Sequence, residues 1–93
     1  MTDPHIDTIG RGPDLVLLHG WAMHSGVFAA LAEALAPRFT LHLVDLPGHG
    51  HSRDSALPLA LEPVVAAVAA RAPRAVWAGW SLGGLFALHA AAT

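Results

Sequence analysis

Ser81 is the residue whose type and setting most clearly predict chemistry in this sequence, because it lies in the run Gly79-Trp80-Ser81-Leu82-Gly83. A serine hydroxyl attacks a carbonyl carbon only where a general base and hydrogen-bond donors surround it. The run matches the nucleophile elbow, a sharp turn from strand to helix that exposes the serine oxygen. Glycines at positions 79 and 83 remove the Cβ atoms that would clash there. The pattern alone is weak, and an ordinary turn is the alternative.

Apolar segments on both sides give the pattern the context that it needs. Residues 75–78 (AVWA) are typical of a strand, and residues 85–92 are compatible with a helix. We therefore predict that Ser81 is the nucleophile of an acyl transfer and that Gly79 and Gly83 form the elbow.

A second apolar run, residues 15–18 (LVLL), leads directly into His19-Gly20-Trp21. Such a run is typical of a strand that is buried on both faces of a parallel sheet. Elbow enzymes bind the developing oxyanion with one N–H after the nucleophile and one from the loop after an earlier strand. We therefore assign the backbone amides of Trp21 and Leu82 to the oxyanion hole. We expect His19 to hold its loop through backbone hydrogen bonds rather than to act as the base.

A third strand is predicted over residues 40–45, followed by a loop that contains Pro47. Strands separated by helical segments, here 27–35 and 61–71, predict an α/β fold with a parallel sheet and its functional loops at the carboxyl ends of the strands. We expect Asp45 to fix a loop rather than to be the triad acid, because in elbow enzymes the acid follows the serine.

Helix ends are less well marked in this sequence than strand ends. Ser25 is available as the N-cap of the first predicted helix, which ends near Pro37. Pro63 is tolerated in the first turn of the second helix, and Pro73 lies beyond its end.

Residues 15–21 (LVLLHGW), 39–48 (FTLHLVDLPG) and 79–84 (GWSLGG) together resemble the α/β-hydrolase fold and, within it, the biotin-pathway carboxylesterases. The resemblance covers almost the whole chain and implies a three-layer αβα architecture. It also implies that residues 1–93 are the N-terminal part of a single hydrolase domain. The chain would then be truncated after the nucleophile helix, with the lid and the C-terminal half absent.

The resemblance implies a serine carboxylic ester hydrolase that forms an acyl-enzyme on Ser81 and demethylates an ester linked to an acyl-carrier protein. Trp21, Ser81 and Leu82 would bind the substrate, with the Trp21 side chain as a wall of the acyl pocket. The triad Asp and His would lie beyond residue 93, so we expect the chain alone to be inactive. Another hydrolase of this fold (a lactonase, aminopeptidase or carbon–carbon bond hydrolase) and a non-catalytic binding fragment remain as alternatives.

Seven histidines raise the question of a local base. His19, His49 and His51 lie on loops at the correct edge of the predicted sheet, and one of them could approach Ser81. Each has a simpler role in holding its loop, whereas His42 and His89 are expected to be structural.

Metal and cofactor motifs are weak. His49 and His51 are spaced like a ligand pair, but a closed zinc site needs four ligands and the chain has no cysteine. Ser81 occupies the position where a dinucleotide fingerprint needs glycine, and no lysine is present for a phosphate-binding loop. We expect no metal and no cofactor.

Composition restricts the remaining classes. A net charge of -2 with 13% charged and 54% hydrophobic residues is typical of a folded globular chain, without a basic stripe for nucleic acid. No signal-peptide pattern and no run of membrane-spanning length is visible. We expect a cytoplasmic protein with no nucleic-acid or membrane partner. An exposed apolar sheet edge would favour oligomerisation or aggregation of the truncated chain.

Overall fold

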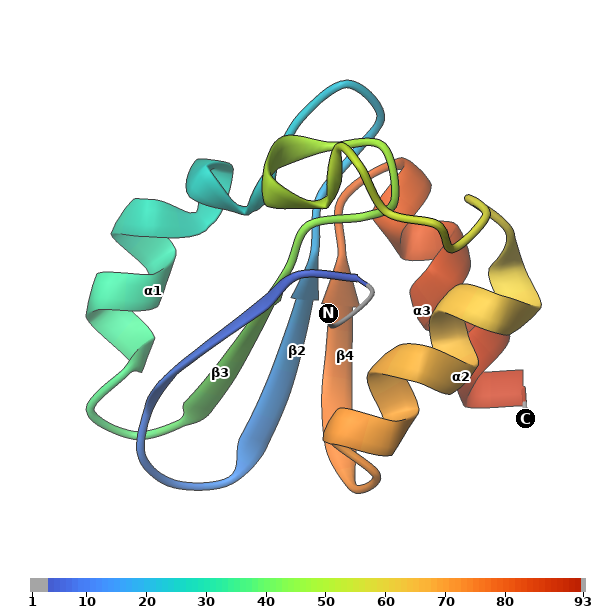
Figure 1. Ribbon diagram of the computed structural model, residues 1–93. Helices are drawn as coiled ribbons and strands as arrows, with labels where there is room; N and C mark the ends of the chain where they lie inside the picture. The colour runs from blue at the N-terminus through green and yellow to red at the C-terminus, as the bar shows by residue number, and fades with distance from the viewer. Residues whose placement is uncertain (1–3, 93) are drawn as a thin grey trace.

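The computed structural model describes residues 4–92, which form one mixed sheet with helices on both faces (Figure 1). The strands are β1 (Ile6–Gly10), β2 (Asp14–Leu18), β3 (Thr40–Val44) and β4 (Ala75–Gly79). The α-helices are α1 (Ala29–Leu35), α2 (Leu61–Arg71) and α3 (Leu82–Ala92), and two short 3-10 helices are η1 (Ser25–Phe28) and η2 (Gly50–Ser52).

The strand order is β1-β3-β2-β4. β2 pairs in parallel with β3 and with β4, whereas β1 runs antiparallel to β3. The predicted α/β class is therefore confirmed, but the expectation of a parallel sheet is wrong at β1. Sequence patterning missed β1 because only Ile6 of its five residues is even partly buried. Backbone pairing with β3 determines this strand, rather than an alternating apolar face.

Alternation along β2 distributes its side chains between the two faces of the sheet. Val16 and Leu18 join the main core, whereas Leu17, equally buried, points to the face that carries α1. Helices α2 and α3 cover the first face and contact each other (Figure 1). The main core contains Val16, Leu18, Val44, Leu46, Val64, Val65, Val68, Ala72 and Phe86.

The helices confirm part of the sequence prediction and correct the rest. Helix α2 has the predicted bounds, 61–71, and buries Val64 and Val68 on one face. The segment predicted as one helix over 27–35 is split into η1 and α1. Helix α3 begins at Leu82, earlier than the predicted 85, because the turn at the elbow already has helical hydrogen bonds.

The expected N-cap is also wrong. The cap of η1 is His24, whose Nδ1 accepts a hydrogen bond of 3.0 Å from the Gly26 N–H. Ser25 is buried instead, and its own N–H donates to Asp45 at 2.7 Å. Ser25 is therefore bonded to a carboxylate far away in the sequence, and the neighbouring His24 is the cap.

β4 lies at one edge of the sheet, and among residues 4–92 its strand partner is β2. Val76 on this strand and Leu85 and Leu88 on α3 are largely exposed. Self-association of the chain stays a prediction that this apolar surface favours. No helix in residues 4–92 is both long and apolar enough to cross a membrane.

The first turn of α3 packs very closely against the ends of β2 and β4. A Cβ atom on Gly83 would stand 2.2 Å from the Leu18 carbonyl oxygen, and one on Gly79 would stand 2.2 Å from the Gly83 carbonyl oxygen. Both neighbours are backbone atoms that cannot rotate away. Gly84 is different, because a Cβ atom there meets only the Gly79 oxygen, at 3.6 Å.

Replacing Gly83 by alanine should therefore lower the free energy of unfolding by about 3 kcal/mol, since a methyl group is forced into backbone. The matched variant Gly84→Ala, one residue further along the same helix, should be neutral or stabilising by up to about 1 kcal/mol, because alanine is the better helix former. Urea unfolding followed by circular dichroism measures both. Equal stability of the two variants would contradict the close packing described for Gly83.

Candidate active site

Three loops meet at the carboxyl ends of the parallel strands, at the upper end of the sheet in Figure 1. Leu18, the last residue of β2, pairs with Val44 of β3 and with Gly79 of β4. The strand ends are therefore level, and the loops that follow them are neighbours. Trp21 and Ser81 lie on two of these loops, Gly79 ends β4, and Leu82 and Gly83 begin α3.

Ser81 lies on the turn between β4 and α3 with a φ of 54°. Residues other than glycine rarely adopt this left-handed conformation, and it persists only where the surrounding structure enforces it. The Trp80 N–H donates to the Leu18 carbonyl at 2.9 Å, and the Gly84 N–H donates to the Ser81 carbonyl at 2.9 Å. The strained residue is therefore fixed on both sides. Its side chain is exposed, and within residues 4–92 its Oγ makes no hydrogen bond.

The backbone amides of Trp21 and Leu82 make no hydrogen bond to another residue within the described part of the chain. Leu82 is the first residue of α3, where helix N–H groups lack an intrahelical acceptor and the helix dipole favours negative charge. The Trp21 loop is held by Ala22, whose φ is 63° and whose N–H donates to His49 Nε2 at 2.9 Å. Both amides are thus available to an acceptor from outside these residues.

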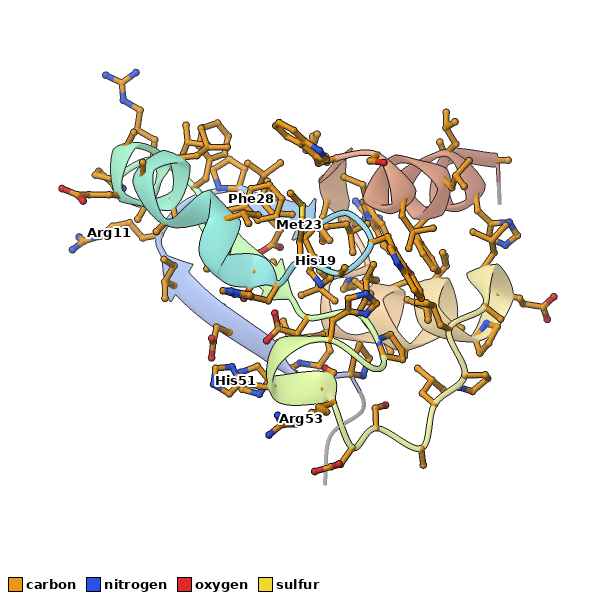
Figure 2. All side chains as sticks on the ribbon, turned by 90° about the horizontal axis from the view of Figure 1, so that it is seen from above. Arg11, His19, Met23, Phe28, His51 and Arg53 are labelled. Atoms are coloured by element: carbon orange, nitrogen blue, oxygen red, sulfur yellow. The ribbon has the colours of Figure 1, made fainter. Side chains whose placement is uncertain are left out.

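His19 is fully buried and links two loops (Figure 2). Its Nδ1 donates to the Gly20 carbonyl at 2.7 Å, and its Nε2 accepts from the Leu46 N–H at 2.9 Å. An acceptor role at Nε2 requires the neutral ring, and burial lowers the pKa of His19 below its ordinary value. The expected role of His19 in holding its loop is confirmed, and both ring nitrogens are committed.

Asp45 is buried at the end of β3, and backbone N–H groups surround its carboxylate. Oδ1 accepts from Ser25 at 2.7 Å and Oδ2 accepts from His51 at 3.0 Å. Burial alone would raise the pKa of Asp45, but the hydrogen bonds from these two amides outweigh it and lower that pKa. Asp45 therefore fixes loops, as the sequence analysis expected.

The other histidines also have partners of their own. His49 Nδ1 donates to the Pro47 carbonyl at 3.0 Å, while its Nε2 accepts from Ala22. His42 contacts Asp14 at 2.8 Å, in keeping with a structural role. His51 lies against His5, with 4.7 Å between the ring centroids. Among residues 4–92, no histidine hydrogen-bonds Ser81, so these residues leave the position of the general base open.

Trp80 of the elbow lines one apolar hollow, and Trp21 of the loop after β2 lines a second one. The first was not predicted, and it is lined by Met23, Val27, Phe28, Leu31 and Trp80. Figure 2 shows Met23 and Phe28 of this hollow close to each other. Trp21 instead borders the second hollow, where its ring meets the His49 ring edge-on, with 5.3 Å between centroids. Val27 and Leu31 are exposed and four residues apart, but no single segment signals this hollow, because Trp80 comes from a distant part of the sequence.

A serine held on a strained turn between strand and helix, at the carboxyl edge of an α/β sheet, is the arrangement of the α/β hydrolases. A model of the alpha/beta hydrolase family matches residues 15–93, and the chain belongs to that family.

Two named relatives and one solved structure are similar to this chain. The chain is 74% identical over 89 residues to the pimeloyl-[acyl-carrier protein] methyl ester esterase of Xanthomonas campestris pv. campestris (strain B100). The match covers 96% of this chain and 35% of that protein. The esterase of the same name from Stenotrophomonas maltophilia (strain K279a) is 72% identical, with 96% and 34% covered. A thermophilic esterase from Thermogutta terrifontis superposes with a TM-score of 0.84 at 25% identity, over 96% of this chain and 35% of that one. The chain thus spans about a third of the length of the relatives that it matches.

His19 should make stability depend on pH in a defined direction. Its folded-state pKa lies below the unfolded value of about 6.5, so the unfolded chain binds more protons as the solution is acidified. The contribution of neutral His19 is therefore complete above about pH 6.5 and is lost as the pH falls towards the lowered pKa.

We expect His19→Gln to lower the free energy of unfolding by about 1–3 kcal/mol at pH 7.5, because the bond to Gly20 is lost. The decrease should be smaller at pH 5.5, because there the unaltered protein has already lost part of the stability that neutral His19 contributes. Urea titrations of both proteins at the two pH values give the comparison. A stability difference that is the same at both would be inconsistent with a buried neutral His19.

Proposed function

We propose that this protein is a serine carboxylesterase in which Ser81 is the nucleophile and the amides of Trp21 and Leu82 bind the oxyanion. The observation that carries the proposal is the strained, backbone-fixed conformation of Ser81 at the start of α3, with an unbonded N–H group on the next residue. Backbone strain of this kind is retained at sites where it holds a reactive side chain in an exposed position. Gly79 and Gly83 make the turn compact enough to form.

The substrate that we propose is the methyl ester of a pimeloyl group on an acyl-carrier protein. The support is the 74% identity to the Xanthomonas campestris esterase that carries this name. The apolar hollow beside Trp80 has the character needed for an acyl chain, and the Trp21 side chain would form a wall on the other side of the elbow. The protein would act in the cytoplasm, without a cofactor.

The proposed reaction has two steps. Ser81 Oγ attacks the ester carbonyl carbon as a base takes its proton, and the oxyanion is held by the two amides. The intermediate collapses, the base returns the proton to the leaving oxygen, and methanol departs from the acyl-enzyme. Water, deprotonated by the same base, then releases the free carboxylic acid and restores Ser81.

In this proposal the base comes from outside residues 4–92, because His19 and His49 already use both ring nitrogens on the backbone. His51, the third candidate, lies against His5 and Asp45 instead. We propose that a histidine and its acid partner lie in the part of the relatives' length that this chain does not span. Residues 1–93 would then be part of one hydrolase domain and would have no esterase activity alone.

A chimaera tests the proposal directly. This chain would replace the matching 35% of the Xanthomonas campestris esterase, and release of methanol from pimeloyl-[acyl-carrier protein] methyl ester would be measured. We expect hydrolysis by the chimaera and a loss of about 10⁴-fold or more in kcat for its Ser81→Ala variant. Thr8→Ala, which removes a hydroxyl on β1 at the other edge of the sheet, should keep the activity. Hydrolysis that survives Ser81→Ala would refute the assignment of the nucleophile.

A further inference from the structure

A second cluster of reactive side chains lies near β1, at one edge of the sheet, whereas the elbow follows β4 at the other edge. His5 and Asp7 belong to the segment that enters and forms β1, and His51 belongs to η2. One potential ligand atom from each residue lies within 4.8 Å of those of the other two. None of these residues takes part in the proposed ester hydrolysis. We propose that His5, Asp7 and His51 bind one divalent transition-metal ion of the Zn²⁺ type.

The spacing of the first two groups already suits a shared ion. His5 Nε2 lies 3.1 Å from Asp7 Oδ1. Two ligands of a tetrahedral zinc ion, each bonded at about 2.0–2.1 Å, are separated by about 3.4 Å. An ion can therefore replace the direct contact between these two side chains with only a small shift of either. His51 is the most exposed of the three, with 76% of its side chain accessible, so its ring is free to adjust.

Asp45 gives His51 the support that metal-binding histidines usually have. His51 Nδ1 lies 3.3 Å from Asp45 Oδ2, which leaves Nε2 as the ligand atom. A carboxylate that accepts from the second ring nitrogen sets the tautomer and the ring orientation of a metal-bound histidine. Asp45 thus orients the proposed ligand His51 in addition to holding the loops.

The backbone holds both histidines in place before any ion binds. The His5 N–H donates to Ser52 Oγ at 2.7 Å, and the His5 carbonyl accepts from the Asp45 N–H at 3.0 Å. The His51 N–H donates to Asp45 Oδ2 at 3.0 Å. Two segments that are distant in sequence are therefore joined at one point, and their histidine rings lie 4.7 Å apart. Little ordering of the chain is needed for them to meet an ion.

The ligand set favours a particular class of cation. Two imidazoles and one carboxylate suit Zn²⁺ and neighbouring transition metals, whereas Mg²⁺ and Ca²⁺ require oxygen ligands. Three protein ligands leave a position for water. Arg53 lines the same hollow as Asp7 and His51, and Figure 2 shows it beside His51. Its positive charge opposes the ion, so binding should be modest in strength.

His49 is not available as a partner of His51, because both of its ring nitrogens are bonded to the backbone. The partner of His51 is His5, which only the pairing of β1 with β3 brings near.

Titration of the protein with Zn²⁺ by calorimetry tests the site. We expect one Zn²⁺ per chain and binding at least tenfold weaker in each of His5→Ala, Asp7→Asn and His51→Ala. The matched variants His89→Ala and Asp54→Asn change the same residue types outside the cluster and should keep the affinity of the unaltered protein. Mg²⁺ should not bind there. Circular dichroism of each variant establishes that it is folded.

Nitrogen NMR of the histidine rings supplies an independent readout. Zn²⁺ should shift the ring signals of His5 and His51 and leave those of His19 and His49 in place. Undiminished Zn²⁺ binding by folded His51→Ala, an equal loss in His89→Ala, or ring shifts confined to other histidines would each overturn the proposal.

Discussion

The close contact between the first turn of α3 and the ends of β2 and β4 is the constraint on which the candidate site depends. It exists because positions 79 and 83 have no side chains, so the helix backbone can approach the Leu18 carbonyl. With the helix in that place, the chain must reverse within one residue, and Ser81 takes the left-handed conformation. Holding a serine there costs on the order of 1–3 kcal/mol, which the surrounding packing and hydrogen bonds must offset.

The polar side chains around the elbow serve mainly to build its loops. His19 joins the loop after β2 to the loop after β3, and Asp45 joins the start of η1 to η2. Each is buried, and each makes hydrogen bonds to backbone amides that would otherwise lack partners. Among the described residues, no buried side-chain nitrogen or oxygen is left without a hydrogen bond. The residues that look most catalytic near Ser81 are therefore the framework that positions the Trp21 amide and the elbow.

Local patterns in the sequence predicted those parts of the structure that local physics determines. The buried run of β2, the elbow pattern around Ser81 and helix α2 all follow from the spacing of apolar residues and glycines within a few positions. Asp45 could be assigned to loop fixing because its place in the chain order argued against catalysis, and its contacts agree.

Features that depend on contacts between residues far apart in the sequence could not be predicted from local patterns. β1 forms because its backbone pairs with β3, although its side chains are mostly exposed. His24 caps η1 in place of Ser25, whose N–H binds Asp45, twenty residues away. The approach of His5 to His51 and the hollow beside Trp80 likewise require the assembled sheet. No single segment carries a signal for any of these.

The most direct test of the central claim, that Ser81 is presented next to two oxyanion-binding amides, is a crystal structure of the chimaeric esterase inactivated by a fluorophosphonate. The account predicts a covalent phosphorus adduct on Ser81 Oγ, with one phosphoryl oxygen about 2.7–3.1 Å from the backbone nitrogens of both Trp21 and Leu82. An adduct on another residue, or a phosphoryl oxygen directed away from these two amides, would contradict it.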